Sequence, residues 1–382
     1  MGFLKKYFYI IFILTIFLEG CLPSVIKLDI KPDPISYPMF GKVPYRDFYI
    51  PVSIGDSLKL KWEKDINGGI TNSTVTIYDS YIFINDLSGW ITCLDFNTGK
   101  QLGQLKDKGA IFSSPIVDNN ILIYTISLNN ENYSLLNFYN LRTGEPIFNI
   151  KIKDKILSEL IKTKDGVIFN TINGNVYKYN INGTKVWEAE TKAHMHCSPA
   201  MNDNAIIIGN DDGEVIALNA NNGNLIFRKK IGYIFTSNIS ISDSTAFLGD
   251  KNGVLFAVDL KNGTVKWKVE TGSEIISTPV FKDNYVYAGN LGGRFYAIDI
   301  DNGKINWQNE INGVINATPL LANNYLIIPN LDGELDFVET KTGKVAKRFI
   351  LPSHARLTPL YFRNTLFIGY DNGILGAYEI VQ

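Results

Sequence analysis

The chain has 382 residues, 45% of them hydrophobic, and a formal net charge of −1 at pH 7. This hydrophobic content excludes a disordered chain, and the balanced charge gives no indication of nucleic-acid binding. Three cysteines, Cys21, Cys93 and Cys197, are too few and too widely spaced for a disulfide framework, a zinc site or attached haem.

The N-terminus predicts an exported lipoprotein. A basic start precedes an apolar run over residues 7–18, as in a secretory signal peptide, and the run is short for a membrane span. The next residues, Leu-Glu-Gly-Cys (18–21), resemble a bacterial lipobox, in which the cysteine is lipidated and becomes the mature N-terminus. We therefore expect a signal peptide over 1–20 and lipidation at Cys21, with an ordinary signal peptide or a single anchor as the alternative.

The segment after the cysteine predicts a tether. Residues 22–57 contain six prolines and few regular patterns. Such composition favours a semi-extended spacer, which would hold the folded domain away from the membrane. Leu22 stands where the enteric sorting rule places an aspartate for inner-membrane retention, so this position resembles a signal for the outer membrane.

From residue 58 to 382 the sequence repeats with a period of about 40 residues. Each repeat contains four short runs of β-branched and aromatic residues, separated by turns rich in Asn, Asp and Gly, and shows no helical periodicity. This pattern predicts an all-β fold, an eight-bladed β-propeller of four-stranded antiparallel blades. A β-solenoid is the alternative, although its coils are usually shorter. The clearest marker is a turn glycine in seven of the eight repeats: Gly99, Gly144, Gly183, Gly223, Gly263, Gly303 and Gly343.

The phase of the repeats predicts how the ring closes. The first strand, over residues 58–65, has no blade before it, and the last repeat ends one strand short. We expect the N-terminal strand to become the outer strand of the eighth blade, because closure leaves no inner sheet edge unpaired.

Aromatic residues follow the turn glycines by four positions. On the outer strand of a blade, such rings are expected to pack between neighbouring blades. A carbohydrate-binding shelf is the alternative, but repetition around the ring favours packing. The residues are Phe148, Trp187, Phe227, Trp267 and Trp307.

The motif Ala-Ile-Asp-x-x-x-Gly-x-x-x-Trp (297–307), which recurs with Val for Ile at 257–267, resembles the tryptophan-docking repeat of pyrroloquinoline-quinone-type eight-bladed propellers. Within this class, a lipid-anchored ring of this size is similar to the BamB family, the lipoprotein subunits of the outer-membrane β-barrel assembly machine. The resemblance implies a non-catalytic protein at the outer membrane that faces the periplasm. It also implies binding to the periplasmic domains of the barrel-forming subunit, and assistance to the insertion of outer-membrane proteins.

The loops that lead into the inner strands are the expected partner-binding surface, because they surround the mouth of the central channel. All three histidines of the chain, His194, His196 and His354, fall in these loops. A His-x-His pair could supply ligands to a transition metal, but it would make only a partial site, so we expect no metal. The residues we expect near partner contacts are His194, Glu274, Asn316 and Arg356.

Two other functions remain as alternatives. A quinoprotein dehydrogenase would share the ring, but such enzymes are larger and often carry a vicinal cysteine pair, which this sequence lacks. Asp211-Asp212-Gly213 favours a hairpin turn rather than a calcium loop. We therefore expect no catalytic residues and no cofactor, quinone included. A generic envelope scaffold or sensor would have the same sequence pattern.

Overall fold

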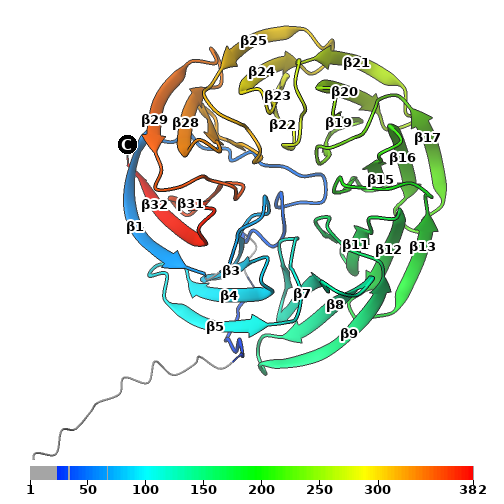
Figure 1. The fold of residues 1–382 in the computed structure, drawn as a ribbon, viewed down its shortest axis with the longest axis vertical. Coiled ribbons are helices and arrows are strands. Elements are labelled where there is room, and N and C mark those ends of the chain that lie inside the picture. The colour runs from blue at the N-terminus through cyan, green and yellow to red at the C-terminus, as the bar shows by residue number, and fades with distance from the viewer. Residues whose placement is uncertain (1–23, 33–34, 67, 382) are drawn as a thin grey trace, which may run out of the picture.

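The structure, a computed structural model, describes residues 24–32, 35–66 and 68–381. Eight four-stranded antiparallel sheets stand radially around a central channel (Figure 1). The predicted all-β, eight-bladed propeller is therefore confirmed. The expected signal peptide and Cys21 lie outside the described residues. Within those ranges, no helix is long and apolar enough to cross a membrane.

Each blade runs from an inner strand at the channel to an outer strand at the rim. Blade 1 comprises β2 (Thr76–Tyr78), β3 (Tyr81–Asn85), β4 (Trp90–Asp95) and β5 (Gln101–Lys106). Blade 2 comprises β6 (Ile116–Asp118), β7 (Ile121–Ser127), β8 (Tyr133–Asn140) and β9 (Glu145–Lys153). Blade 3 comprises β10 (Ile161–Lys162), β11 (Gly166–Asn170), β12 (Asn175–Asn180) and β13 (Lys185–Glu190). Blade 4 comprises β14 (Ala200–Met201), β15 (Ala205–Gly209), β16 (Glu214–Asn219) and β17 (Leu225–Lys230).

The second half of the ring follows the same order. Blade 5 comprises β18 (Ser240–Ser242), β19 (Thr245–Gly249), β20 (Val254–Asp259) and β21 (Val265–Glu270). Blade 6 comprises β22 (Val280–Lys282), β23 (Tyr285–Gly289), β24 (Arg294–Asp299) and β25 (Ile305–Glu310). Blade 7 comprises β26 (Leu320–Leu321), β27 (Tyr325–Pro329), β28 (Glu334–Glu339) and β29 (Val345–Ile350). Blade 8 comprises β30 (Leu360–Phe362), β31 (Thr365–Gly369), β32 (Ile374–Val381) and β1 (Ser57–Asp65).

The ring closes through its two chain ends, as predicted. Strand β1 pairs antiparallel with β32, from Leu58 opposite Ile380 to Asp65 opposite Ile374. It thereby serves as the outer strand of blade 8 (Figure 1). Closure leaves every blade with a full set of four strands.

The aromatic residues after the turn glycines pack between blades, as predicted. Trp267 of blade 5 lies against Gly303 of blade 6, where a Cβ would come within 2.8 Å of the indole. Its indole N–H donates a hydrogen bond of 2.9 Å to the carbonyl of Ile300 in the same neighbouring blade. A side chain on the glycine would displace the ring, and the positive φ of Gly303, 74°, also favours glycine. The same contact joins Trp62 to Gly99, Phe148 to Gly183, Trp187 to Gly223, Phe227 to Gly263 and Trp307 to Gly343.

The segment before β1 does not form the expected tether. Its described residues pack on the ring, and Phe40, Arg46 and Phe48 are almost completely buried. Figure 1 shows the segment, in blue, crossing the middle of the ring. Its backbone pairs with inner strands around the channel, through Val117 N–H to the carbonyl of Pro38, Met201 N–H to that of Pro44, Ile241 N–H to that of Tyr45, and Ile50 N–H to that of Leu321. This segment, described over residues 24–32 and 35–56, forms a strap along the inner strand edges. The expectation of a free spacer is wrong for these residues.

The strap also fills the groove where a docking aromatic residue is missing. Blade 1 has Gly103 at the position that holds Trp267 in blade 5. There Ile26, with no exposed surface, packs in the core between blades 1 and 2, and its Cα would lie 3.1 Å from a Cβ on Gly103. Lys347 is the corresponding exception in blade 7, and Ile54 packs in the core between blades 7 and 8. The N-terminal segment therefore completes the side walls of the ring as well as its centre.

Candidate functional site

One end of the ring is formed by the loops that lead into the inner strands, which we call the mouth loops. In seven blades, the central hairpin donates a backbone N–H to a carbonyl of the mouth loop in its own blade, as Asp371 does to His354 over 2.9 Å. Hairpins and mouth loops therefore lie on one face, the mouth face. The mouth loops span residues 68–75, 107–115, 154–160, 191–199, 231–239, 271–279, 311–319 and 351–359.

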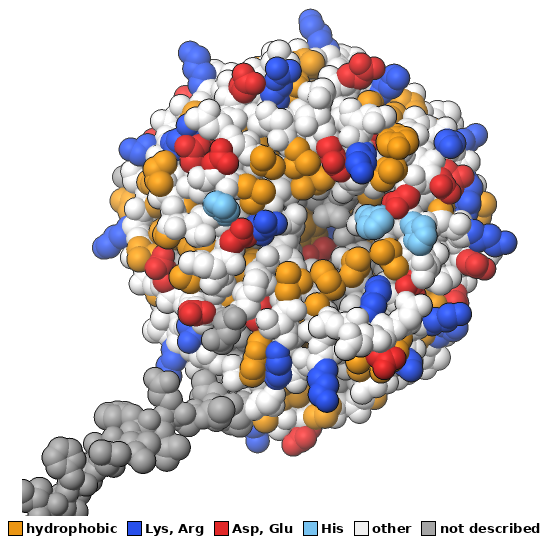
Figure 2. Space-filling view, viewed as in Figure 1, with side chains coloured by type: hydrophobic (Ala, Val, Ile, Leu, Met, Phe, Trp, Pro, Cys, Tyr) orange, Lys and Arg blue, Asp and Glu red, His pale blue; other side chains and the backbone are white. Residues whose placement is uncertain are grey.

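The mouth face displays three of the four expected contact residues. His194 is exposed, and Glu274 and Arg356 are half-buried. The Arg356 guanidinium forms an ion pair with Asp371 of the adjacent hairpin, whose other carboxylate oxygen lies 3.5 Å from the His354 imidazole. Histidine side chains lie on opposite sides of a hollow at the centre of the ring (Figure 2).

Asn316 lies elsewhere than expected. It is only 4% exposed, so it cannot act as a surface loop contact in this arrangement. It occupies the same position of the repeat as Arg356, but its short side chain stays within the channel instead of reaching the surface. Its side-chain oxygen is buried and accepts no hydrogen bond.

The histidines do not converge on a common metal position. His196 Nδ1 lies 2.9 Å from Asp211 Oδ1 in the hairpin of blade 4, whereas His354 belongs to blade 8 across the ring. Among the described residues, no group of three or more His, Cys, Asp or Glu side chains is arranged to hold a metal ion. The two described cysteines, Cys93 and Cys197, are buried and free.

A polar girdle inside the mouth was not predicted. It consists of one side chain from each blade at the same position of the repeat. Each of several members donates its backbone N–H to the side chain of the next, as Ser114 does to Glu159 Oε2 over 2.7 Å and Glu159 does to Ser198 Oγ over 2.9 Å. The members are Thr74, Ser114, Glu159, Ser198, Asn238, Thr278, Thr318 and Thr358. A Ser/Thr-Pro pair in five repeats was the signal available in the sequence.

Glu159 is the acidic member of the girdle, and it lies above the strap. Burial raises the pKa of its carboxyl to about 7, although nearby Arg46 and the two hydrogen bonds from Ser114 oppose this rise. Arg46 of the strap is itself fully buried, and burial lowers its pKa to about 10. Its guanidinium donates to backbone carbonyls of Phe40, Glu159, Leu160 and Pro199 at 2.7–3.4 Å. The strap is thus fastened to blades 3 and 4 beneath the girdle.

Between the mouth loops and the strap lies a channel pocket of about 250 Å³. Seven of the eight blades contribute to its lining. Polar members include Asn72, Glu159, Ser198, Asn238, Asn316 and Thr318, and Phe112, Leu157 and Ile276 are the apolar members. The arrangement can therefore offer hydroxyl, amide and carboxyl groups to a small polar molecule, while the exposed loops above it can contact a larger partner.

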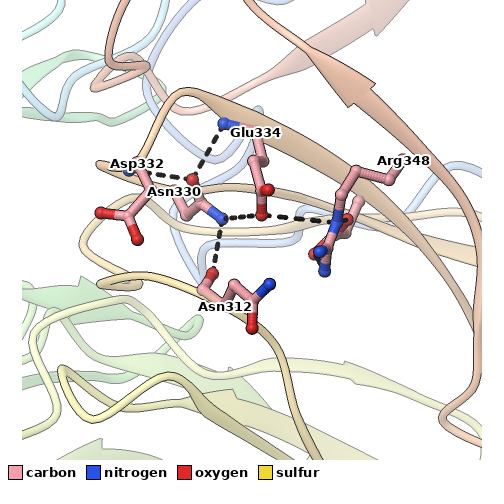
Figure 3. Close-up of polar contacts among 6 residues, drawn as sticks. Asn312, Asn330, Asp332, Glu334 and Arg348 are labelled. Atoms are coloured by element: carbon pink, nitrogen blue, oxygen red, sulfur yellow. Dashed lines mark hydrogen bonds and ion pairs between the residues drawn. The ribbon is translucent and has the colours of Figure 1, made fainter.

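The hairpins of the mouth face are fixed from within the blades, as blade 7 illustrates (Figure 3). Asn330 Oδ1 accepts the backbone N–H of Glu334 over 2.9 Å, and its amide donates to the carbonyl of Asn312 in the mouth loop over 2.6 Å. Arg348 on the outer strand lies between Glu334 and the buried Asp336, with nitrogen–oxygen distances of 3.3 and 2.7 Å. Burial raises the pKa of Asp336, and Arg348 opposes this rise. Such bonding gives the mouth face a fixed shape.

The radial blades and docked tryptophans define the class, an eight-bladed propeller of pyrroloquinoline-quinone-type repeats. The profile of the family described as outer membrane protein assembly factor BamB matches residues 132–349, or 218 of the 382 residues. The chain belongs to this family. A comparison with curated proteins gives no significant match.

Solved structures share the fold at low sequence identity. BamB from Moraxella catarrhalis is 16% identical, with a TM-score of 0.72, over 85% of this chain and 100% of that chain. The computationally designed protein Ika8 is also 16% identical, with a TM-score of 0.72, over 83% of this chain and 98% of that one. A quinohemoprotein alcohol dehydrogenase from Comamonas testosteroni is 12% identical, with a TM-score of 0.75, over 90% of this chain and 80% of that one. These likenesses extend from an assembly factor to an enzyme, so they establish the fold alone.

Proposed function

We propose that this protein is a non-catalytic scaffold that binds the barrel-forming subunit of the outer-membrane assembly machine and assists the insertion of β-barrel proteins. In this proposal Cys21 carries the lipid anchor, the protein sits at the outer membrane facing the periplasm, and the mouth face contacts the periplasmic domains of the partner. The proposal requires no catalytic residue, quinone or metal.

One structural observation supports the choice of the mouth face. The strap covers the inner strand edges at the opposite end of the channel, where the Tyr45 and Ile50 backbone groups are already paired. The mouth face keeps exposed side chains on loops whose backbone is fixed by the hairpins, as at His194 and His354. Fixed loops with projecting polar side chains suit recognition of a partner, because little ordering is needed on binding. Family membership supports the identity of that partner.

Affinity capture from solubilised envelope tests the proposal. We expect the wild-type protein to recover the barrel-forming subunit, and Arg356→Glu or Glu274→Lys to recover less of it with an unchanged melting curve. Arg142→Glu is the matched control, because Arg142 is exposed in the turn between β8 and β9 at the opposite end of blade 2.

Four outcomes would contradict the proposal. Failure of the wild-type protein to recover the barrel-forming subunit would refute the choice of partner, and recovery of another envelope complex would favour a generic scaffold or sensor. Equal losses for Arg356→Glu and the control would refute the mouth face as the contact surface. Oxidation of an alcohol or sugar after addition of quinone would refute the non-catalytic assignment.

A further inference from the structure

We propose that the rim of blades 1 and 2, at its mouth end, lies against a bilayer that contains anionic phospholipids. The inference rests on the lipid anchor at Cys21 proposed above and is independent of the choice of protein partner. It follows from the place where the strap begins, the length of chain between that place and the cysteine, and the side chains that lie around it.

The strap begins in the groove between blades 1 and 2. The hydroxyl of Ser24 accepts the backbone N–H of Lys106, the last residue of β5, over 3.1 Å. The backbone N–H of Ile26 donates to the Tyr139 hydroxyl of blade 2 over 3.2 Å. Strand β5 ends at the mouth face, because the mouth loop 107–115 follows it directly. Figure 1 shows the start of the strap, in dark blue, at the rim between β5 and β9.

The chain between this point and the expected anchor is short. Cys21 is three residues before Ser24. An extended chain spans at most about 3.3–3.6 Å per residue, so the two residues are no more than about 11 Å apart. This distance is close to the Debye length, about 8–10 Å at physiological ionic strength. A lipid on Cys21 would therefore hold charges at this rim near enough to the bilayer to be only partly screened.

Lysine and aromatic side chains occupy the mouth end of the two blades that flank the start of the strap. Lys106 Nζ lies 4.8 Å from the centre of the Trp90 ring, and Lys151 Nζ lies 3.7 Å from that of Tyr133. Leu87, in the hairpin of blade 1, is 40% exposed. Trp and Tyr are enriched at the level of lipid head groups, where lysine also extends its charged end. We call this surface the anchor patch, which consists of Leu87, Trp90, Lys106, Tyr133, Lys151 and Lys153.

The charge of this region is mainly positive. Four of its lysines are exposed: Lys106, Lys108, Lys151 and Lys153. Two acidic side chains of the same segments reach the surface, the exposed Glu131 and the half-buried Asp107, whose carboxylate accepts the Tyr124 hydroxyl over 2.7 Å. Lysines close to an anionic bilayer are attracted to it, and the attraction falls off within a Debye length. The patch therefore suits an anionic surface.

The repeat shows that this charge belongs to one side of the ring. Three positions after the docking position, the outer strand has a lysine in blades 1, 2 and 4: Lys106, Lys151 and Lys230. The same position is acidic in blades 3, 5, 6 and 8: Glu190, Glu270, Glu310 and Asp65. The blade fold thus does not require a lysine there. Blades 5 and 6, across the ring from blades 1 and 2, would be repelled by an anionic bilayer, whereas the side where the strap begins would be attracted.

Fluorescence quenching on the lipidated full-length protein, inserted into preformed vesicles, tests the inference. A bimane label on Leu87→Cys reports on the hairpin of blade 1, and one on Lys251→Cys reports on the equivalent exposed position of blade 5. The native Cys93 and Cys197 are buried, so they should not be labelled. The vesicles contain phosphatidylcholine, phosphatidylglycerol and a lipid with a spin-labelled head group as the quencher. We expect quenching of the Leu87→Cys label and none of the Lys251→Cys label.

Charge reversal separates contact through the patch from tethering alone. In the Leu87→Cys background, Lys106→Glu should lower the ratio of docked to undocked protein about fivefold or more, the effect of removing one lysine from an anionic surface. Lys230→Glu is the matched control, because it makes the same change at the same repeat position of blade 4, and it should be quenched as the parent is. Vesicles of phosphatidylcholine and quencher alone, or high salt, should reduce quenching of the parent.

The mass of the purified protein reports separately on the lipid at Cys21. A lipidated protein whose Leu87→Cys label is not quenched would overturn this inference and leave the proposed anchor intact. A mass without the lipid would overturn the anchor and this inference with it. Equal quenching of the two labels, equal effects of Lys106→Glu and Lys230→Glu, or full quenching without phosphatidylglycerol would each show that the anchor patch does not face the bilayer. A melting curve of each variant separates loss of contact from loss of the fold.

Discussion

Substitution of Ile26 by alanine tests whether the strap is a structural part of the ring. Ile26 has no exposed surface, and its backbone N–H donates to the Tyr139 hydroxyl of blade 2 over 3.2 Å. Leu28 continues the attachment, with its N–H 2.7 Å from the carbonyl of Leu141. The side chain therefore fills an inter-blade groove whose walls are held by backbone hydrogen bonds.

The expected magnitude follows from this geometry. Replacing a buried isoleucine by alanine costs about 2–5 kcal/mol, and the cost rises when the site cannot collapse onto the cavity. Here the opposing surface is Gly103, which has no side chain that could move into the space. We therefore expect the free energy of unfolding to fall by about 3–4 kcal/mol, provided that the strap stays attached.

Urea denaturation followed by circular dichroism measures this loss, with Leu225→Ala as the control. Leu225 is 58% exposed on β17, so its truncation should change the free energy of unfolding by no more than about 0.5 kcal/mol. Early proteolysis within residues 24–56 of Ile26→Ala would show that the strap detaches first. If Ile26→Ala and Leu225→Ala have the same denaturation midpoint and the same proteolysis pattern, the strap does not support the ring.

Three further predictions concern the ring and its girdle. Gly303→Ala should destabilise the protein more than Gly272→Ala, by a difference of about 2 kcal/mol in urea denaturation. Both glycines have a positive φ, but of the two only Gly303 faces a tryptophan. Equal losses of stability would contradict the assignment of the tryptophan to packing between blades. Deletion of Ser57–Asp65 should lower the melting temperature sharply, because blade 8 loses its outer strand, and a melting curve like that of the full chain would refute closure. The raised pKa of Glu159, about 7 against 4.5, means that the folded state retains a proton that the unfolded state has released, so its contribution to stability is complete below about pH 4.5 and is lost as the pH rises through 7. Between about pH 5 and about pH 8 the wild type should lose up to roughly 3 kcal/mol relative to Glu159→Gln, and parallel stability profiles would show that the carboxyl is not protonated in the fold.

The repeat predicts most of the ring because the same local contacts recur in each blade. The turn glycines, the docked aromatic residues and the phase of the first strand all depend on contacts within a blade or with the next one. Trp267 and Gly303 illustrate this, since their spacing in the sequence is set by the spacing of blades. Ring closure by β1 follows from the same count.

The strap and the buried position of Asn316 depend on contacts that lie outside the repeat. Six prolines suggest a spacer, whereas the apolar Ile26, Phe40 and Phe48 find partners only after the channel exists. The exceptions at Gly103 and Lys347 were a usable signal, because each leaves a groove that something else must fill. Asn316 aligns with Arg356, but alignment gives the position of a side chain and not its reach, so a short amide stays inside where a long guanidinium extends outward.

Pairing of β1 with β32 also determines the order in which this protein can fold. The first strand is synthesised about three hundred residues before its partner, so it remains an unpaired edge while seven blades form. Contacts this distant in sequence form slowly, and a waiting edge can pair with the wrong chain. This strand contains three lysines, Lys59, Lys61 and Lys64. Charged side chains on an edge strand disfavour its pairing with the edges of other sheets. Pairing with β32 therefore completes blade 8 and also covers the edge of β1.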